Sequence, residues 1–148
     1  MTATHKRPIL LVEDSPMDLD LSLRALSARK IANEIVVARD GEEALGQIAR
    51  WDAGAPPPIV VLLDLRLPRV SGLEVLRRLR EHPRYGAIPV VVLTTSRADI
   101  DVREAYALGA NSYIVKPVEF EKFVEVAHQI DLYWCLLNHP DPLDAPAT

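Results

Sequence analysis

Five short apolar runs recur along the chain, and a segment with the spacing of an amphipathic helix follows each of them. The runs cover residues 9–12, 35–38, 58–63, 89–93 and 112–115. They are mostly continuous rather than alternating, which is typical of strands buried on both faces of a parallel sheet. The pattern predicts five strands that alternate with five helices.

Capping residues, prolines and glycines mark where the helices begin and end. Ser15 followed by Pro16 predicts a helix start, and Ser71 with Glu74 forms a capping box. Gly109 fits the position just past a helix C-terminus. The expected helices cover residues 16 to about 30, 42–50, 72 to about 80, 99 to about 108 and 119 to about 137, with a loop at 51–58.

Short connections and right-handed crossovers predict an α/β fold with a doubly wound five-stranded parallel sheet and an extended last helix. Five strands favour the flavodoxin-like order 2-1-3-4-5. In that order the C-terminal ends of strands one, three, four and five lie side by side. We therefore expect one rim of the sheet to carry Glu13, Asp14, Asp64, Thr94 and Lys116.

Composition adds limits to this picture. The chain has 148 residues, of which 49% are hydrophobic and 26% charged, as expected for one globular domain. We expect an N-terminal arm at 1–7, the domain at 8–138 and a disordered Pro-rich tail at 139–148. A net charge of −4 argues against a nucleic-acid or membrane partner. One cysteine, no signal peptide and no apolar run of span length predict a cytoplasmic protein.

The residues of the predicted rim have a shared chemical logic. Three carboxylates around one hollow favour a hard divalent cation, of which Mg²⁺ is the usual one and Mn²⁺ or Ca²⁺ a substitute. A cation, an ammonium and a hydroxyl together suit a phosphoryl group on a carboxylate nucleophile. Each residue alone has a simpler interpretation: Asp64 or Thr94 as a cap, Glu13 and Asp14 as a solvated turn, Lys116 as a surface charge.

The sequence resembles the response regulator receiver domains of two-component signalling over residues 8 to about 137. The matching motifs are Val12-Glu13-Asp14, Leu63-Asp64-Leu65-Arg66-Leu67-Pro68 with Ser71-Gly72, Leu93-Thr94-Thr95-Ser96, and the run from Gly109 to Pro117. The resemblance implies that Asp64 takes a phosphoryl group from a histidine of a sensor kinase. It implies no enzymatic activity other than the chain's own phosphorylation and dephosphorylation.

The family also implies roles for the neighbouring residues. Asp14, Asp64 and the Arg66 backbone carbonyl would bind Mg²⁺, and Glu13 would act mainly through metal-bound water. Lys116 would pair with the acceptor and then with the phosphoryl group. Thr94 and Tyr113 would move together as a switch, and the Lys116–Pro117 peptide bond would be cis. The Arg66 side chain could reach or shield the phosphoryl group, or it could be a solvated surface arginine.

A narrower resemblance concerns residues 105–113 with Tyr133 and Trp134, which look like the single-domain regulators paired with bacterial phytochromes. It implies a bacteriophytochrome kinase as partner. Three other interpretations are an aspartyl-phosphate enzyme, which would carry an Asp-x-Asp pair at its first strand, a flavodoxin-like nucleotide binder, and a pseudo-receiver that is never phosphorylated. Glu13 and Asp14 would repel phosphate at a nucleotide loop, and the intact rim set argues against a pseudo-receiver.

The end of the last helix is apolar nearly all round, which predicts a homodimer. A stripe from Phe120 to Leu137 follows helical spacing and should pack on the sheet. The predicted interface consists of Ile130, Tyr133, Trp134, Leu136 and Leu137. A symmetric partner would cover this surface. The alternatives are that the tail from Asn138 folds back over it or that a kinase docks there.

Overall fold

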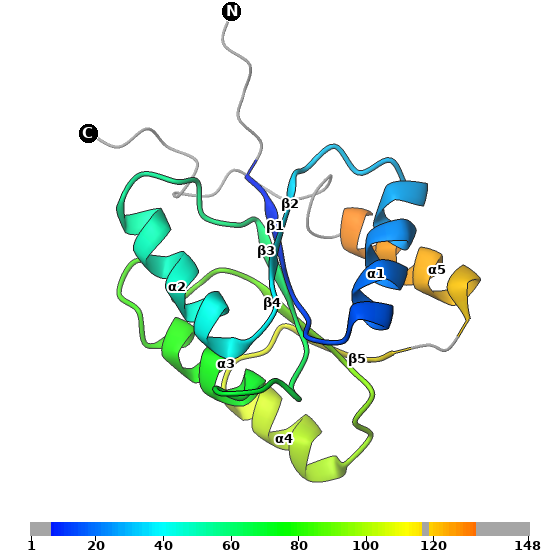
Figure 1. Cartoon of the computed structure of the whole chain (residues 1–148). Helices are drawn as coiled ribbons and strands as arrows, with labels where there is room; N and C mark the ends of the chain where they lie inside the picture. The colour runs from blue at the N-terminus through cyan, green and yellow to red at the C-terminus, as the bar shows by residue number, and fades with distance from the viewer. Residues whose placement is uncertain (1–6, 117–118, 133–148) are drawn as a thin grey trace, which may run out of the picture.

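The computed structural model describes residues 7–116 and 119–132. Within these residues a parallel sheet of five strands is sandwiched between two layers of helices (Figure 1). The strands are β1 (Ile9–Val12), β2 (Ile35–Ala38), β3 (Val60–Leu63), β4 (Val90–Thr94) and β5 (Ser112–Val115). The helices are α1 (Pro16–Ala28), α2 (Gly41–Asp52), α3 (Gly72–Arg80), α4 (Asp99–Ala107) and α5 (Phe120–Ile130).

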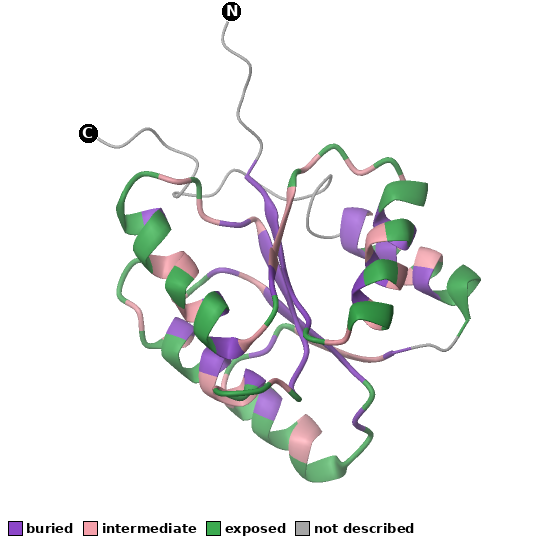
Figure 2. Cartoon of the chain, viewed as in Figure 1, coloured by how far each residue is buried: buried purple, intermediate pink, exposed green. Residues whose placement is uncertain are grey.

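The strand order is β2-β1-β3-β4-β5, so the predicted topology is confirmed. Helices α1 and α5 pack together on one face of the sheet, and α2, α3 and α4 cover the other face (Figure 1). Strands β1, β3 and β4 are buried along their whole length, which explains their continuous apolar runs (Figure 2). The two edge strands are only partly buried.

The predicted caps are present. Ser15, Asp40 and Ser71 each accept a backbone N–H through the side chain at the start of α1, α2 and α3. Gly109 has φ 96° and follows the last turn of α4, which is the left-handed position where glycine is favoured. The reciprocal half of the capping box is replaced, because Glu74 pairs with Arg77 and Arg78 instead.

Three expectations need correction. The predicted loop at 51–58 begins too early, because α2 continues to Asp52 and buries the Trp51 indole edge-on against Tyr85, with ring centroids 5.2 Å apart. Phe120 was expected to pack on the sheet, yet it is 38% exposed at the start of α5. Arg7 was assigned to a separate arm, but it is buried and its guanidinium donates to the carbonyls of Pro57 and Pro58.

The last helix packs on the sheet through Phe123, Ala127 and Ile130, which are buried. Ile130 therefore belongs to the core and has little surface to offer a partner. Residues 133–137 of the predicted extension lie outside the described residues, as do Tyr133, Trp134, Leu136 and Leu137 of the predicted interface and the tail at 139–148.

Candidate functional site: an acidic cluster around one lysine

Neighbouring strand ends bring the predicted rim residues together. Asp64 directly follows β3, and its backbone N–H donates to the carbonyl of Val12, the last residue of β1, at 3.1 Å. The backbone N–H of Lys116 likewise donates to the carbonyl of Thr94 at 2.8 Å. These bonds continue the parallel ladders one step beyond the strands, so the residue after each strand is held at the same edge of the sheet.

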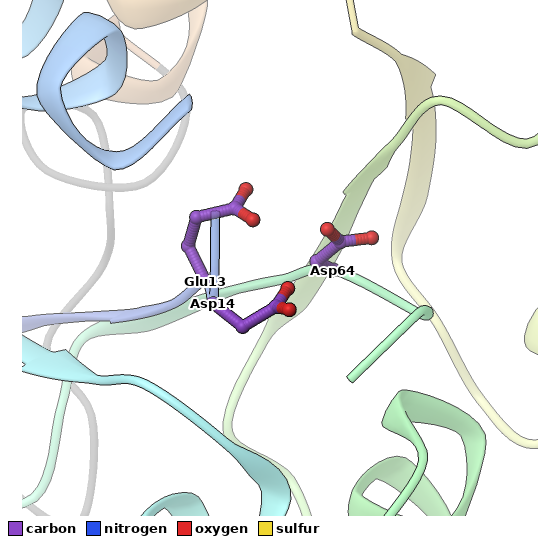
Figure 3. A group of neighbouring side chains, drawn as sticks. All are labelled: Glu13, Asp14 and Asp64. Atoms are coloured by element: carbon purple, nitrogen blue, oxygen red, sulfur yellow. The ribbon is translucent and has the colours of Figure 1, made fainter. Parts of the chain in front are cut away.

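Three carboxylates share a small space at this edge. Glu13, Asp14 and Asp64 each offer one carboxylate oxygen, and these oxygens all lie within 4.8 Å of one another. Figure 3 shows the three carboxyl groups gathered around a common space. Glu13 and Asp64 are buried, whereas Asp14 is exposed. Oxygen ligands at this spacing, with one open side, fit a hard divalent cation that keeps water ligands.

Lys116 provides the positive charge of the site and is itself buried. Its ammonium donates to Glu13, to Asp64 Oδ2 at 3.1 Å and to Asp18 Oδ2 at 3.0 Å. Burial alone would lower the pKa of Lys116, but the bond to Glu13 and the charges of Asp64 and Glu13 outweigh it and raise the pKa. The lysine is therefore fully charged at neutral pH.

Glu13 lies deepest of the three acids. Burial raises the pKa of its carboxyl group to about 7, against the bond and the charge of Lys116, which act to lower it. The charge of Asp64 adds to the rise, and the backbone N–H of Ser15, donated to Oε2 at 3.2 Å, opposes it. A carboxylate in this position gains from a cation, because the cation replaces the water that burial has removed.

The loop that follows β3 and begins at Asp64 is held by its own backbone. The Arg66 N–H donates to Asp64 Oδ1 at 3.2 Å, which orients the carboxylate toward the rim. Gly72, the first residue of α3, packs directly behind it, and a Cβ there would lie 2.2 Å from the Asp64 carbonyl oxygen. Only a residue without a side chain allows α3 to start this close to Asp64.

Thr94 and Tyr113 lie next to the rim and share a neighbour. Thr94 is fully buried, and its hydroxyl accepts the Ser96 N–H at 3.5 Å. The Tyr113 hydroxyl donates to the Ser96 carbonyl at 2.9 Å. The loop after β4 therefore contacts both predicted switch residues, although no bond joins either of them to Asp64 among the described residues.

Two residues of this region were missed by sequence reasoning. Asp18 is not among the predicted site residues, yet its carboxylate accepts a hydrogen bond from Lys116. Asp101 was not singled out, yet it accepts the Ser96 hydroxyl at 2.5 Å and lies 3.8 Å from the Arg66 guanidinium. The Arg66 carbonyl stays a prediction as a metal ligand, and the predicted cis bond at Lys116–Pro117 lies outside the described residues.

Comparison with known proteins agrees with this geometry. The family model of the response regulator receiver domain matches residues 9–128. Response regulator Rcp1 of the cyanobacterium Synechocystis is 37% identical over 128 residues, which cover 85% of this chain and 87% of that protein. Among the described helices, none combines the length and the apolar character that a membrane span requires.

Solved structures give the same result. The phosphorylated cyanobacterial phytochrome response regulator RcpA superposes with a TM-score of 0.83 at 34% identity, covering 90% of this chain and 97% of that one. Mn²⁺-bound Rcp1 superposes with a TM-score of 0.80 at 35% identity, covering 90% of this chain and 97% of that one. The bacteriophytochrome response regulator AtBRR superposes with a TM-score of 0.72 at 48% identity, covering 90% of this chain and 99% of that one. The pseudo-receiver alternative has no support in these matches.

Proposed function

Because the chain belongs to the response regulator receiver family, we propose that it signals by accepting a phosphoryl group on Asp64 from a sensor histidine kinase. The observation that supports this most directly is the ring of charges around Asp64, in which two further acids and one buried ammonium surround the acceptor carboxylate. A structural relative of this type, RcpA, has been solved in a phosphorylated form.

In the proposed reaction an Asp64 oxygen attacks phosphorus on the kinase phosphohistidine. The P–N bond breaks, the histidine nitrogen keeps its electron pair, and a P–O bond forms. Asp14, Asp64 and the Arg66 carbonyl would hold Mg²⁺, with Glu13 acting through its water ligands. The cation would neutralise charge on the phosphoryl oxygens. Receiver domains bind Mg²⁺, and the relative Rcp1 binds Mn²⁺ in its solved structure.

Lys116, Thr94 and Tyr113 would respond to the negative charge of the phosphoryl group on Asp64. Lys116, which donates to Asp64 Oδ2 in the unphosphorylated chain, would donate to a phosphoryl oxygen. Thr94 would turn its hydroxyl to another phosphoryl oxygen, and the loop at Ser96 would move with it. Tyr113 is bonded to that loop, so its rotamer would follow. This is a local electrostatic change that biases a two-state surface.

For the partner we propose a histidine kinase of the bacteriophytochrome type. RcpA and AtBRR are both described as phytochrome response regulators, and AtBRR is 48% identical to this chain. Rcp1 matches over 87% of its own length, so the likeness is to a whole regulator. We also propose that the chain forms a homodimer through the end of its last helix.

Intact-mass measurement tests the proposal. Incubation with Mg²⁺ and acetyl phosphate should add one phosphoryl group that is labile to hydroxylamine, and excess chelator should prevent the addition. Asp64→Asn should remain unmodified, while Asp52→Asn, an acid outside the site bonded to Tyr85, should react as the wild type does. Modification of Asp64→Asn, or undiminished modification in chelator, would contradict the proposal. Transfer from a purified phytochrome kinase tests the partner separately.

A further inference from the structure

The ammonium of Lys116 has a third carboxylate partner that lies outside the family motifs quoted above. Its Nζ donates to Glu13, to Asp64 Oδ2 at 3.1 Å and to Asp18 Oδ2 at 3.0 Å. A protonated lysine has three N–H donors and no acceptor, so these three bonds use its full capacity. Asp18 is therefore a structural member of the site, although its side chain is 30% exposed.

The local structure explains how Asp18 reaches the lysine. Asp18 is the third residue of α1, and its backbone N–H is bound by the Ser15 hydroxyl at 3.3 Å. Side chains in a helix tilt toward its N-terminus, so this carboxylate points back to the strand ends. Glu13 directly follows β1 and Asp18 lies in the first turn of α1, so the two carboxylates hold Nζ from two different segments.

The lysine side chain is a flexible chain of four carbons, so its ammonium must be held by other contacts if one N–H is to point in a fixed direction. With two N–H groups fixed on Glu13 and Asp18, the third is directed at Asp64 Oδ2. Phosphoryl transfer turns the Asp64 carboxylate into an acyl phosphate and places a dianion beside it. The third N–H can then pass to a phosphoryl oxygen while the other two bonds stay in place.

We propose that Asp18 is a positioning residue, which acts through Lys116 by aiming its third N–H at the phosphoryl group on Asp64. The inference rests on the proposed function of Asp64. Charge alone leads to the opposite expectation, because Asp18 adds negative charge beside a site that must take a phosphoryl dianion. Removal of Asp18 should strengthen the binding of a phosphoryl group or its mimic if charge dominates, and should weaken that binding if positioning dominates.

Beryllofluoride, formed from beryllium chloride and sodium fluoride with Mg²⁺, is a tetrahedral phosphoryl mimic that separates the two effects. Its dissociation constant would be measured by NMR titration of the full chain. Asp18→Ala should bind about three- to tenfold more weakly, which is the range of one partly exposed charge-assisted bond. Asp18→Asn, whose amide oxygen can still accept the bond, should recover most of the affinity.

Asp20→Asn is the matched control, because it removes the same charge from the same helix at an exposed residue paired only with Arg24 among the described residues. It should bind as the wild type does. A positioning role also requires Lys116, so Asp18→Ala should have no further effect in a Lys116→Met background. A merely structural role would weaken binding equally in both backgrounds.

The outcomes separate the two proposals. If the wild type binds beryllofluoride and Asp18→Ala binds equally well or better, the role of Asp18 is wrong and the proposed function stands. The role is also wrong if Asp18→Asn is no better than Asp18→Ala, or if Asp20→Asn is as weak as Asp18→Ala. If the wild type neither binds the mimic nor becomes phosphorylated, the proposed function fails and this inference fails with it.

Discussion

The guanidinium of Arg66 lies 3.8 Å from the carboxylate of Asp101, so a residue two places after Asp64 is paired with the first turn of α4. The Arg66 side chain is 70% exposed, which makes this a weak pair in water. The Asp101 carboxylate also accepts a hydrogen bond from the Ser96 hydroxyl. The Ser96 carbonyl in turn accepts a hydrogen bond from the Tyr113 hydroxyl. The pair therefore links the loop after β3 to the loop after β4, which contacts Thr94 and Tyr113.

We predict that Arg66 and Asp101 set the lifetime of the aspartyl phosphate together. In Asp101→Asn the Ser96 bond can remain, but the guanidinium is released toward the phosphoryl group and should lengthen its half-life about two- to fivefold. Arg66→Ala should shorten it by a similar factor. Decay would be followed by intact mass, with Arg69→Ala as control, since Arg69 pairs instead with Asp40 and Glu42. An Asp101→Asn effect that persists without Arg66 would refute the link.

Metal binding should release protons and depend on pH. Burial raises the pKa of Glu13 to about 7, above its value in the unfolded chain. This group therefore stabilises the metal-free fold most at low pH, and the contribution is lost as pH rises through about 7. Mg²⁺ favours the ionised form, so its affinity should be about tenfold lower at pH 6 than at pH 8. Calorimetry in buffers of different ionisation enthalpy would count the protons, and Glu13→Gln should abolish this dependence.

Lys116→Met should uncouple phosphorylation from the structural change. The acceptor carboxylate remains, so acetyl phosphate should still modify Asp64, at a reduced rate. The ammonium that would report the new charge to Thr94 and Tyr113 is gone, so the phosphorylated variant should keep the amide chemical shifts of Ser96 and Tyr113 close to their unphosphorylated values. Wild-type shift changes in the phosphorylated variant would show that Lys116 is not the reporter.

Gly72→Ala should destabilise the fold and disturb the acceptor. The added Cβ would meet the Asp64 carbonyl oxygen at 2.2 Å and the Leu65 Cα at 2.6 Å, so α3 must move away. The expected cost is about 1–3 kcal/mol, or several degrees in Tm. Gly46→Ala is the matched control, because nothing lies within 4 Å of its Cβ position in α2. That variant should be slightly stabilised.

The homodimer is tested by light scattering at tens of micromolar. We expect a dimer for the wild type and a shift to monomer for Trp134→Ala and Leu136→Glu. A monomeric wild type would remove the dimer from the proposal. A dimer that survives both substitutions would place the interface elsewhere.

Sequence reasoning recovered the elements whose signals are local. The apolar run before Asp64 and the caps at Ser15 and Ser71 depend on neighbours in the chain, and the structure has them as predicted. The helical position of Trp51 was missed because the last turn of its helix is stabilised by a contact with Tyr85, which lies far along the chain. The burial of Phe120 was wrongly predicted because helical spacing shows which side chains share a face of the helix. It does not show at which residue that face stops contacting the sheet.

The site was recovered in part for the same reason. Parallel strand ends make the meeting of Glu13, Asp64 and Lys116 predictable from topology alone. Asp18 carries an ordinary signal, an acid in a first helical turn, which is explained equally well by the helix dipole. Its contact with Lys116 depends on the height of α1 above the sheet, and periodicity does not specify this. The tilt of helical side chains toward the N-terminus was the one available clue.

The bond between Lys116 and Glu13 spans 103 residues, and this separation affects how the protein is made. The acids arrive with β1 and β3, early in synthesis, and the lysine arrives with β5, near the end. Until β5 docks, Glu13, Asp14 and Asp64 face one another without their ammonium. Under the proposed function, we therefore expect a chain in which β5 has not yet docked to be phosphorylated more slowly than the folded protein.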